Sequence, residues 1–231
     1  LVGIDESTGR QPVVVGLGET THSTRECFRL KIGLIQLLVA RGLRTVAFEA
    51  DVTATLGLDA YVRRGEGDPA TALAGLEKWM WRVESTRDLL CWLRLFNRGR
   101  APDDQVRVRG VDLGHPAAPA TPLRSYFEGV DPGYAEQSDA LAKLDATAEA
   151  PVPDDPDERE RTLDAVEAVV DTLDSRLAAD QSTYVDAAGR RRWEHARHLC
   201  RVVERTCDWH RVRHEKPGPH EAGMQRRDRH M

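Results

Sequence analysis

The sequence predicts an α/β fold with a mostly parallel central sheet, flanking helices and a long helical hairpin covering the carboxyl-terminal rim of the strands. Three observations lead to this prediction. Short apolar runs alternate with helical patterns between residues 12 and 114, as in parallel sheets. These runs end in an acidic residue or in a glycine-flanked turn. Beyond residue 156 the pattern is helical over two long segments, 157–180 and 188–214.

The first strand and first helix are expected on either side of residue 18. Residues 13–17 are apolar and β-branched and are bounded by proline and glycine, which predicts a buried parallel strand. A helix is expected over 24–41, because Ser23 and Glu26 match a capping box and Gly42 matches a helix end. The apolar stripe of this helix has spacings of three and four residues and consists of Phe28, Ile32, Ile35 and Val39.

The rest of the chain continues this alternation and then becomes helical. Further strands are expected at 45–49 and 106–112, and shorter helices at 54–63, 70–78 and 85–97. A proline- and alanine-rich linker follows at 115–122. We therefore divide the chain into an α/β part, 1–114, and a mainly helical part, 115–231.

Four polar residues are expected to meet at one edge of the sheet. Glu19 and His22 lie on the loop between the first strand and the first helix, and Glu49 and Asp112 end the two following strands. The carboxyl ends of parallel strands lie at one edge, where ligands bind. The alternative for each acid is that it caps the next helix or bonds loop amides.

Several segments together resemble the erythromycin esterase family. They are GETTH at 18–22, RTVAFEA at 44–50, WMWR at 79–82, LLCWLRLFN at 89–97, VRGVD at 108–112 and QRRDRHM at 225–231. The family also includes members labelled as succinoglycan biosynthesis proteins. The resemblance is dense between residues 13 and 112 and thin between 116 and 223.

The resemblance implies a carboxylic ester hydrolase that inactivates macrolide antibiotics. It implies that His22 is the general base that activates water, with Glu19 and Glu49 as the motif glutamates. The basic residue of the first helix falls at Lys31, which interrupts an apolar stripe and needs a partner, either Glu49 or Glu19. The alternative for Lys31 is a side chain that snorkels at the domain edge.

Family members are longer than this sequence and carry a second histidine motif beyond the position of Met231. We therefore expect the sequence to be a fragment, or its site to be incomplete. The sequence has no Gly-x-Ser-x-Gly elbow, so a serine acyl-enzyme is not predicted. Arg25 and Asp112 are expected to bind the substrate. Trp79 and Trp81 are expected either to line a cleft for a large apolar ligand or to pack in the hydrophobic core.

Two other functions remain open at this point. Glu19, His22 and Glu49 offer the donor types of a metal-dependent hydrolase. A non-catalytic relative that binds a small molecule is the second alternative. A zinc site at Cys207, His210 and His214, or at the pair His195 and His198, is disfavoured. Arginines surround these residues, and a solvated basic face is the simpler interpretation.

The amino-acid composition limits the classes of molecule that this protein is expected to bind. The 231 residues carry 33 basic and 38 acidic side chains, a net charge of −5, without a basic patch interleaved with aromatics, so nucleic acid is not expected. The apolar runs are too short to cross a membrane. The four cysteines form no Cys-x-x-Cys pair, which favours a reduced, cytoplasmic protein. The expected partner is a small-molecule substrate, with no cofactor or metal; the oligomeric state is left open.

Overall fold

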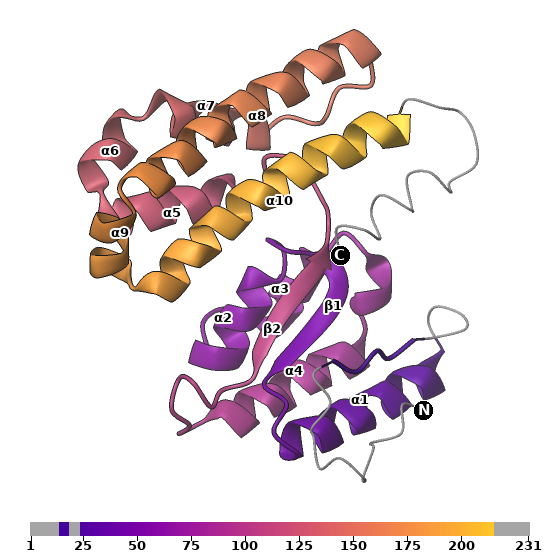
Figure 1. The fold of residues 1–231 in the computed structure, drawn as a ribbon. Helices are drawn as coiled ribbons and strands as arrows, with labels where there is room; N and C mark the ends of the chain where they lie inside the picture. Colours follow the sequence, from indigo (N-terminus) through magenta and orange to yellow (C-terminus); the bar gives the residue numbers. More distant parts are fainter. Residues whose placement is uncertain (1–13, 19–23, 215–231) are drawn as a thin grey trace. The chain divides into compact units, whose positions relative to one another are not determined.

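The computed structural model describes residues 14–18 and 24–214, and only the backbone of the last two of these. Over these residues the fold is mixed α/β, with ten α-helices, one short 3₁₀ helix and two parallel strands (Figure 1). The predicted fold class is confirmed. The strands are β1 (Thr45–Asp51) and β2 (Arg107–Asp112). The helices are α1 (Arg25–Ala40), α2 (Leu56–Arg64), α3 (Pro69–Ala74), η1 (Trp79–Trp81), α4 (Glu84–Asn97), α5 (Ala120–Val130), α6 (Pro132–Gln137), α7 (Asp139–Ala148), α8 (Pro156–Ala179), α9 (Gln181–Ala188) and α10 (Arg190–His214).

The predicted first strand is wrong for the residues that the structure describes. Residues 14–18 have no regular secondary structure, and Val14 is 81% exposed. A strand needs the backbone of a neighbouring strand to bond with, and the described sheet consists of β1 and β2 paired with each other. A β-branched apolar run indicates a strand only where such a neighbour is present.

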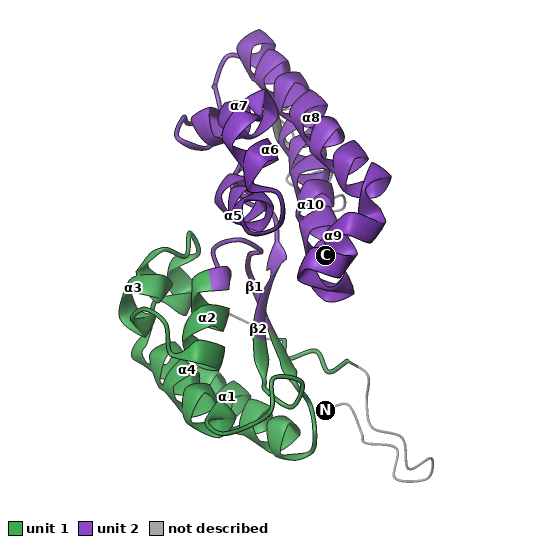
Figure 2. Ribbon diagram, turned by 90° about the vertical axis from the view of Figure 1, so that its left-hand side faces the viewer, with its two compact units in different colours: residues 1–46, 57–107 green, residues 47–56, 108–231 purple. Residues whose placement is uncertain are grey.

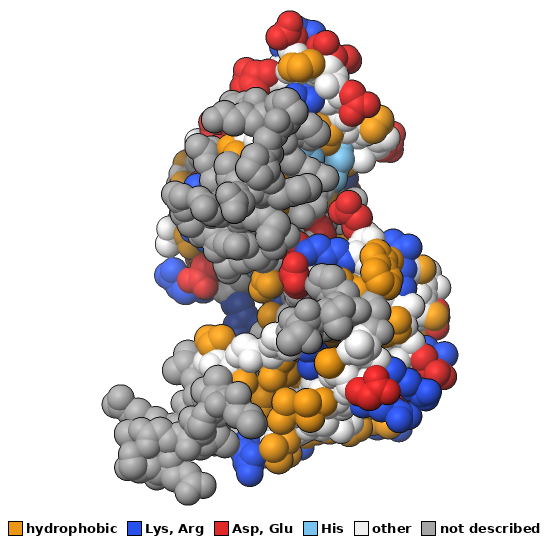
Figure 3. Space-filling view, turned by 90° about the vertical axis from the view of Figure 1, so that its right-hand side faces the viewer, with side chains coloured by type: hydrophobic (Ala, Val, Ile, Leu, Met, Phe, Trp, Pro, Cys, Tyr) orange, Lys and Arg blue, Asp and Glu red, His pale blue; other side chains and the backbone are white. Residues whose placement is uncertain are grey.

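The first helix agrees with the prediction apart from its start. Thr24 is the N-cap of α1, with extended backbone angles and no side-chain capping bond, so the predicted capping box is misplaced. Ser23 lies outside the described residues. Gly42, at φ 106°, ends the helix as predicted, because a positive φ suits glycine. The helix buries Phe28 and Val39 but leaves Leu30 exposed; Figure 3 shows such hydrophobic side chains reaching the surface among charged ones.

The two strands are parallel, with α2, α3 and α4 in the connection between them. Along β1, the buried side chains Val46, Phe48 and Ala50 alternate with more exposed ones. This alternation shows that β1 has one well-covered face, as predicted from its apolar residues.

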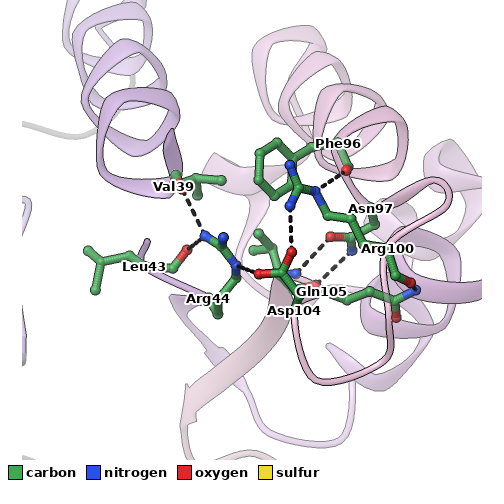
Figure 4. A network of polar contacts seen from close by, with 9 residues as sticks. Val39, Leu43, Arg44, Phe96, Asn97, Arg100, Asp104 and Gln105 are labelled. Carbon is green, nitrogen blue, oxygen red and sulfur yellow. Dashed lines mark hydrogen bonds and ion pairs between the residues drawn. The ribbon is translucent and has the colours of Figure 1, made fainter. Parts of the chain in front are cut away.

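A polar network fixes the amino-terminal ends of both strands (Figure 4). Asn97, at the end of α4, bonds both backbone groups of Val106 just before β2, at 2.7 and 2.8 Å. Arg44, just before β1, donates to the carbonyl oxygen of Val39 at 2.8 Å and to Asp104 at 2.8 Å. Arg100 joins the same carboxylate and lies 4.0 Å from the centre of the Phe96 ring. The polar side chains at the amino-terminal ends of the strands thus stabilise the fold.

The chain divides into two compact units, which we call unit 1 (1–46 and 57–107) and unit 2 (47–56 and 108–231) (Figure 2). The boundary falls inside both strands, so β1 from Ala47 onward and β2 from Val108 onward belong to unit 2. In unit 1, α4 packs against α1 and α3. In unit 2, the end of β2 leads into the helices α5–α10.

The predicted long helices are confirmed as α8 and α10, which pack against each other in unit 2 with α9 between them in sequence. Arg211 of α10 bonds three carboxylates of α8 at 2.7–2.8 Å, those of Glu160, Asp164 and Glu167. Apolar side chains fill the space between the helices. The largest fully buried ones are Tyr184, Phe127, Leu123, Leu141, Leu144, Leu163, Leu173 and Leu177.

Among the helices formed by the described residues, none combines the length and apolar character needed to cross a lipid bilayer.

Candidate active site at the strand ends

The carboxyl ends of β1 and β2 form the candidate site. β1 ends at Asp51 and β2 ends at Asp112, and both residues belong to unit 2. The backbone N–H of Val52 donates to the carbonyl oxygen of Asp112 at 3.3 Å, so the strand ends are still paired there. In parallel sheets, ligands bind beyond the carboxyl ends of the strands. The two carboxylates therefore lie where the chemistry is expected.

The end of β1 differs from the prediction, which placed it at Glu49. Ala50 is buried and continues the alternation of the strand, so Glu49 lies inside β1, half-buried on the more exposed face. Asp51 ends the strand because its Oδ1 accepts the backbone N–H groups of Thr53 and Ala54, each at 2.7 Å, and the Thr53 hydroxyl. Such a turn competes with the extended backbone of a strand.

The end of β2 approaches β1 more closely than a side chain would permit. A Cβ added at Gly110 would lie 2.6 Å from the carbonyl carbon of Asp51. A Cβ added at Gly114 would lie 2.8 Å from the Asp51 Cγ and closer still to its Oδ2. Both glycines are therefore places where one chain segment passes directly against another.

Asp112 is 3% exposed, and its Oδ1 accepts the backbone N–H of Leu113 at 2.9 Å. A buried carboxylate needs such bonds. Asp112 therefore anchors the start of the segment that leads from β2 to α5.

His115 lies on that segment with both ring nitrogens engaged. Nδ1 accepts the backbone N–H of Ala117 at 3.2 Å, and Nε2 donates to the carbonyl oxygen of Ala150 at 3.0 Å. Burial lowers the pKa of His115, a bond to Ala150 opposes this, and the nearby Asp51 also opposes it. The bond from the Ala117 N–H requires an unprotonated Nδ1, so the ring carries its proton on Nε2. A general base needs a ring nitrogen that can contact the substrate or water. Because both nitrogens of His115 bond to the backbone, we assign this side chain a structural role.

His210 connects α10 to the same segment. Its ring is 8% exposed, and Nε2 donates to the carbonyl oxygen of Gly114 at 3.1 Å. Trp209 packs edge-on against the His210 ring, with 4.8 Å between the ring centres. The bond from α10 thus fixes the backbone that follows β2.

The predicted solvated basic face is wrong for Cys207 and His210, which are 0% and 8% exposed, but their burial does not favour a zinc site either. Burial raises the pKa of the Cys207 thiol to about 12, so it stays protonated at neutral pH, whereas zinc needs a thiolate. Burial likewise raises the pKa of the Cys200 thiol to about 12. Among the described side chains, no group of three or more His, Cys, Asp or Glu residues is arranged to hold a metal ion. His195 and His198 stack, with 6.4 Å between their ring centres.

Four of the predicted site residues lie in unit 1. Arg25 is exposed at the start of α1, and the Lys31 ammonium lies 5.8 Å from the centre of the Phe28 ring. Trp81 packs edge-on against the same ring at 5.8 Å, which makes it a core contact. Trp79 is 63% exposed. Glu49 and Asp112 belong to unit 2.

The two residues at the centre of the prediction, Glu19 and His22, lie outside the described residues. Their proposed roles remain predictions. Glu49 and Asp112 both lie in the carboxyl-terminal halves of their strands.

Sequence reasoning missed the role of Asp51, Gly114 and His115. A local signal exists for Asp51, because an acid followed two positions later by threonine is typical of a turn that an aspartate side chain caps. The sequence Asp-Leu-Gly-His directly after a strand likewise marks a loop at the strand end. The contact between Asp51 and Gly114 joins residues far apart in the chain, and local patterns carry no sign of it.

A family model described as erythromycin esterase matches residues 39–231. The chain belongs to the erythromycin esterase family. The matched range contains Glu49, Asp112 and the helical part of unit 2, and it begins after Glu19 and His22. Family membership confirms the resemblance that the sequence motifs indicate.

Three solved structures share the fold. A Bacillus cereus protein is 21% identical, with a TM-score of 0.71, over 92% of this chain and 50% of that chain. A succinoglycan biosynthesis protein is 17% identical, with a TM-score of 0.69, over 93% and 50%. A mutant of the erythromycin esterase EreC in its open conformation is 16% identical, with a TM-score of 0.58, over 93% and 54%. The chain therefore spans about half the length of each of these structures.

Proposed function

We propose that this chain forms part of an ester hydrolase, in which His22 is the general base that activates water for attack on an ester or lactone carbonyl. The observation that carries the proposal is membership of the erythromycin esterase family over residues 39–231. The position of acidic residues at the carboxyl ends of β1 and β2 supports it, because this is where parallel sheets place their ligands.

The two histidines that contact the segment after β2, His115 and His210, support the choice of His22. His115 uses both ring nitrogens for backbone bonds, and His210 uses Nε2 to hold Gly114. A general base must reach the proton that it removes. His22 belongs to the Gly-Glu-x-x-His segment just before α1, and the family resemblance gives it this role.

The reaction uses water as the nucleophile. His22, oriented by Glu19 or Glu49, takes a proton from water while the water oxygen bonds to the carbonyl carbon. A cationic side chain, Lys31 or Arg25, and amides of the first turn of α1 stabilise the negative carbonyl oxygen. The bond to the ester oxygen then breaks, and His22 returns the proton to the departing alkoxide. The products are an acid and an alcohol.

The proposed substrate class, a macrolide lactone, comes from the family to which the chain belongs. A macrolide lactone is large and mostly apolar, and the exposed indole of Trp79 offers a surface for such a ring. Asp112 is the proposed polar contact to the substrate.

The experiment is a hydrolysis screen of the purified protein. Erythromycin and simple aryl esters are incubated with the protein, with and without a chelator, and products are identified by mass spectrometry as the substrate plus one water. Hydrolysis that persists with the chelator supports the proposed mechanism. Hydrolysis that the chelator abolishes and added metal restores contradicts it in favour of a metal-dependent hydrolase. Binding of erythromycin without any product contradicts it in favour of a binding protein.

A further inference from the structure

The side chain of Asp51 and the backbone of Gly114 lie in direct contact at the strand ends. An added Cβ at Gly114 would lie 2.8 Å from the Asp51 Cγ and 3.2 Å from its Cβ. The φ of Gly114 is not positive, so its backbone would accept alanine without strain. The three atoms nearest to an added Cβ all belong to the side chain of Asp51, so this side chain is the main reason for glycine here.

The Asp51 carboxylate is not easily displaced. Its Oδ1 accepts the N–H groups of Thr53 and Ala54 and the Thr53 hydroxyl, so turning the side chain away from Gly114 would break these bonds. Charge-assisted bonds of this kind are among the stronger ones in proteins. One oxygen thus shapes the loop after β1, while the other limits the approach of the loop after β2.

The loop after β2 is held from two further sides. His210 of α10 bonds the Gly114 carbonyl oxygen at 3.1 Å, and the next residue, His115, bonds Ala150 in the connection between α7 and α8. Asp112 bonds the N–H of Leu113 at 2.9 Å. Gly114 therefore contacts the Asp51 carboxylate and, through its carbonyl oxygen, the His210 imidazole.

We propose that Asp51 is a positioning residue, which couples the loops after β1 and β2 and so sets the place of Asp112 and Gly114 at the site. The coupling itself stands on the contacts within unit 2. Its effect on turnover rests on the proposed ester hydrolysis. Asp51 acts through the backbone that it holds rather than through contact with the substrate.

A double-mutant cycle in the full chain tests the coupling without an activity assay. Gly114→Ala should lower the midpoint of thermal unfolding by about 5 °C, since overpacking of a closed space is destabilising. Gly133→Ala is the control, because an added Cβ there meets no atom within 4 Å, and it should not lower the midpoint, since alanine favours the helix α6 more than glycine does. In an Asp51→Ala background, Gly114→Ala should cost less than half of its original shift. An equal cost in both backgrounds would overturn the proposed coupling.

A second arm tests the effect on the reaction. Asp51→Ala should lower kcat about tenfold or more with little change in KM, because misplaced reacting groups slow the chemical step more than binding. Asp51→Asn keeps an acceptor oxygen for Thr53 and Ala54, so it should restore most of kcat. Unchanged kcat in Asp51→Ala would overturn the positioning role even where the cycle shows coupling. If the parent protein hydrolyses no ester, the proposed function fails, while the cycle still decides the coupling.

Discussion

The Nε2 of His210 donates a hydrogen bond to the carbonyl oxygen of Gly114, 3.1 Å away. The bond joins the last turns of α10 to the loop that follows β2, and the two residues are 96 positions apart in the sequence. The long hairpin is thus attached to the strand end on which we place the candidate site. Whether the hairpin covers a substrate there remains a prediction.

Removing this bond should destabilise unit 2. His210→Ala leaves a carbonyl group without its donor and a gap beside Trp209, so we expect a loss of about 2 kcal/mol in the free energy of unfolding. Urea unfolding measures this loss. His198→Ala, on an exposed position of the same helix, is the control and should change stability by less than about 0.5 kcal/mol. Equal losses in the two variants would contradict the role of the bond.

His115 should make stability depend on pH. Burial lowers the pKa of His115 in the folded protein, so the unfolded chain takes up a proton more readily than the folded one. The stabilisation is complete above the ordinary histidine pKa of about 6.5 and is lost as the pH falls below it. The imidazolium form would also turn a second N–H toward the Ala117 N–H. Urea unfolding is measured from about pH 8 to about pH 5, on either side of the ordinary histidine pKa of about 6.5. The parent protein should be more stable than His115→Gln at the higher pH, and this difference should shrink as the pH falls. A constant advantage would refute the neutral, buried ring.

Arg211 should hold the hairpin together. Its guanidinium is 19% exposed and bonds three carboxylates of α8, and these bonds raise its pKa above the ordinary arginine value. Arg211→Ala should therefore lower the free energy of unfolding by about 2 kcal/mol, with a smaller effect at high salt. Arg205, at 50% exposure, pairs with Asp208 on its own helix. Arg205→Ala is the control and should have little effect at any salt concentration.

Local patterns predicted those parts of the fold that depend on local chemistry. The end of α1 at Gly42, the strand run from Thr45 and the two long helices follow from glycine conformation and from periodicity. The strand expected at 13–17 fails because pairing with a neighbour, rather than β propensity, decides whether such a run becomes a strand.

The candidate site was predicted in part, for a related reason. An acid at the end of β2 was correctly placed at Asp112, where the strand pattern stops. The acid at the end of β1 was placed at Glu49 instead of Asp51, since alternation alone does not show where a side chain will cap a turn. The partners of Gly114 come from β1 and α10, and only the folded chain brings them together.

The central claim is that His22 activates water, and the turnover of a His22 variant tests it most directly. Steady-state hydrolysis of erythromycin, or of the best ester from the screen, is measured for the parent, for His22→Ala and for the control His198→Ala. The account predicts that His22→Ala lowers kcat by on the order of a hundredfold or more, as loss of a general base does, while the control keeps the parent rate. Turnover of His22→Ala equal to that of the parent would contradict the account.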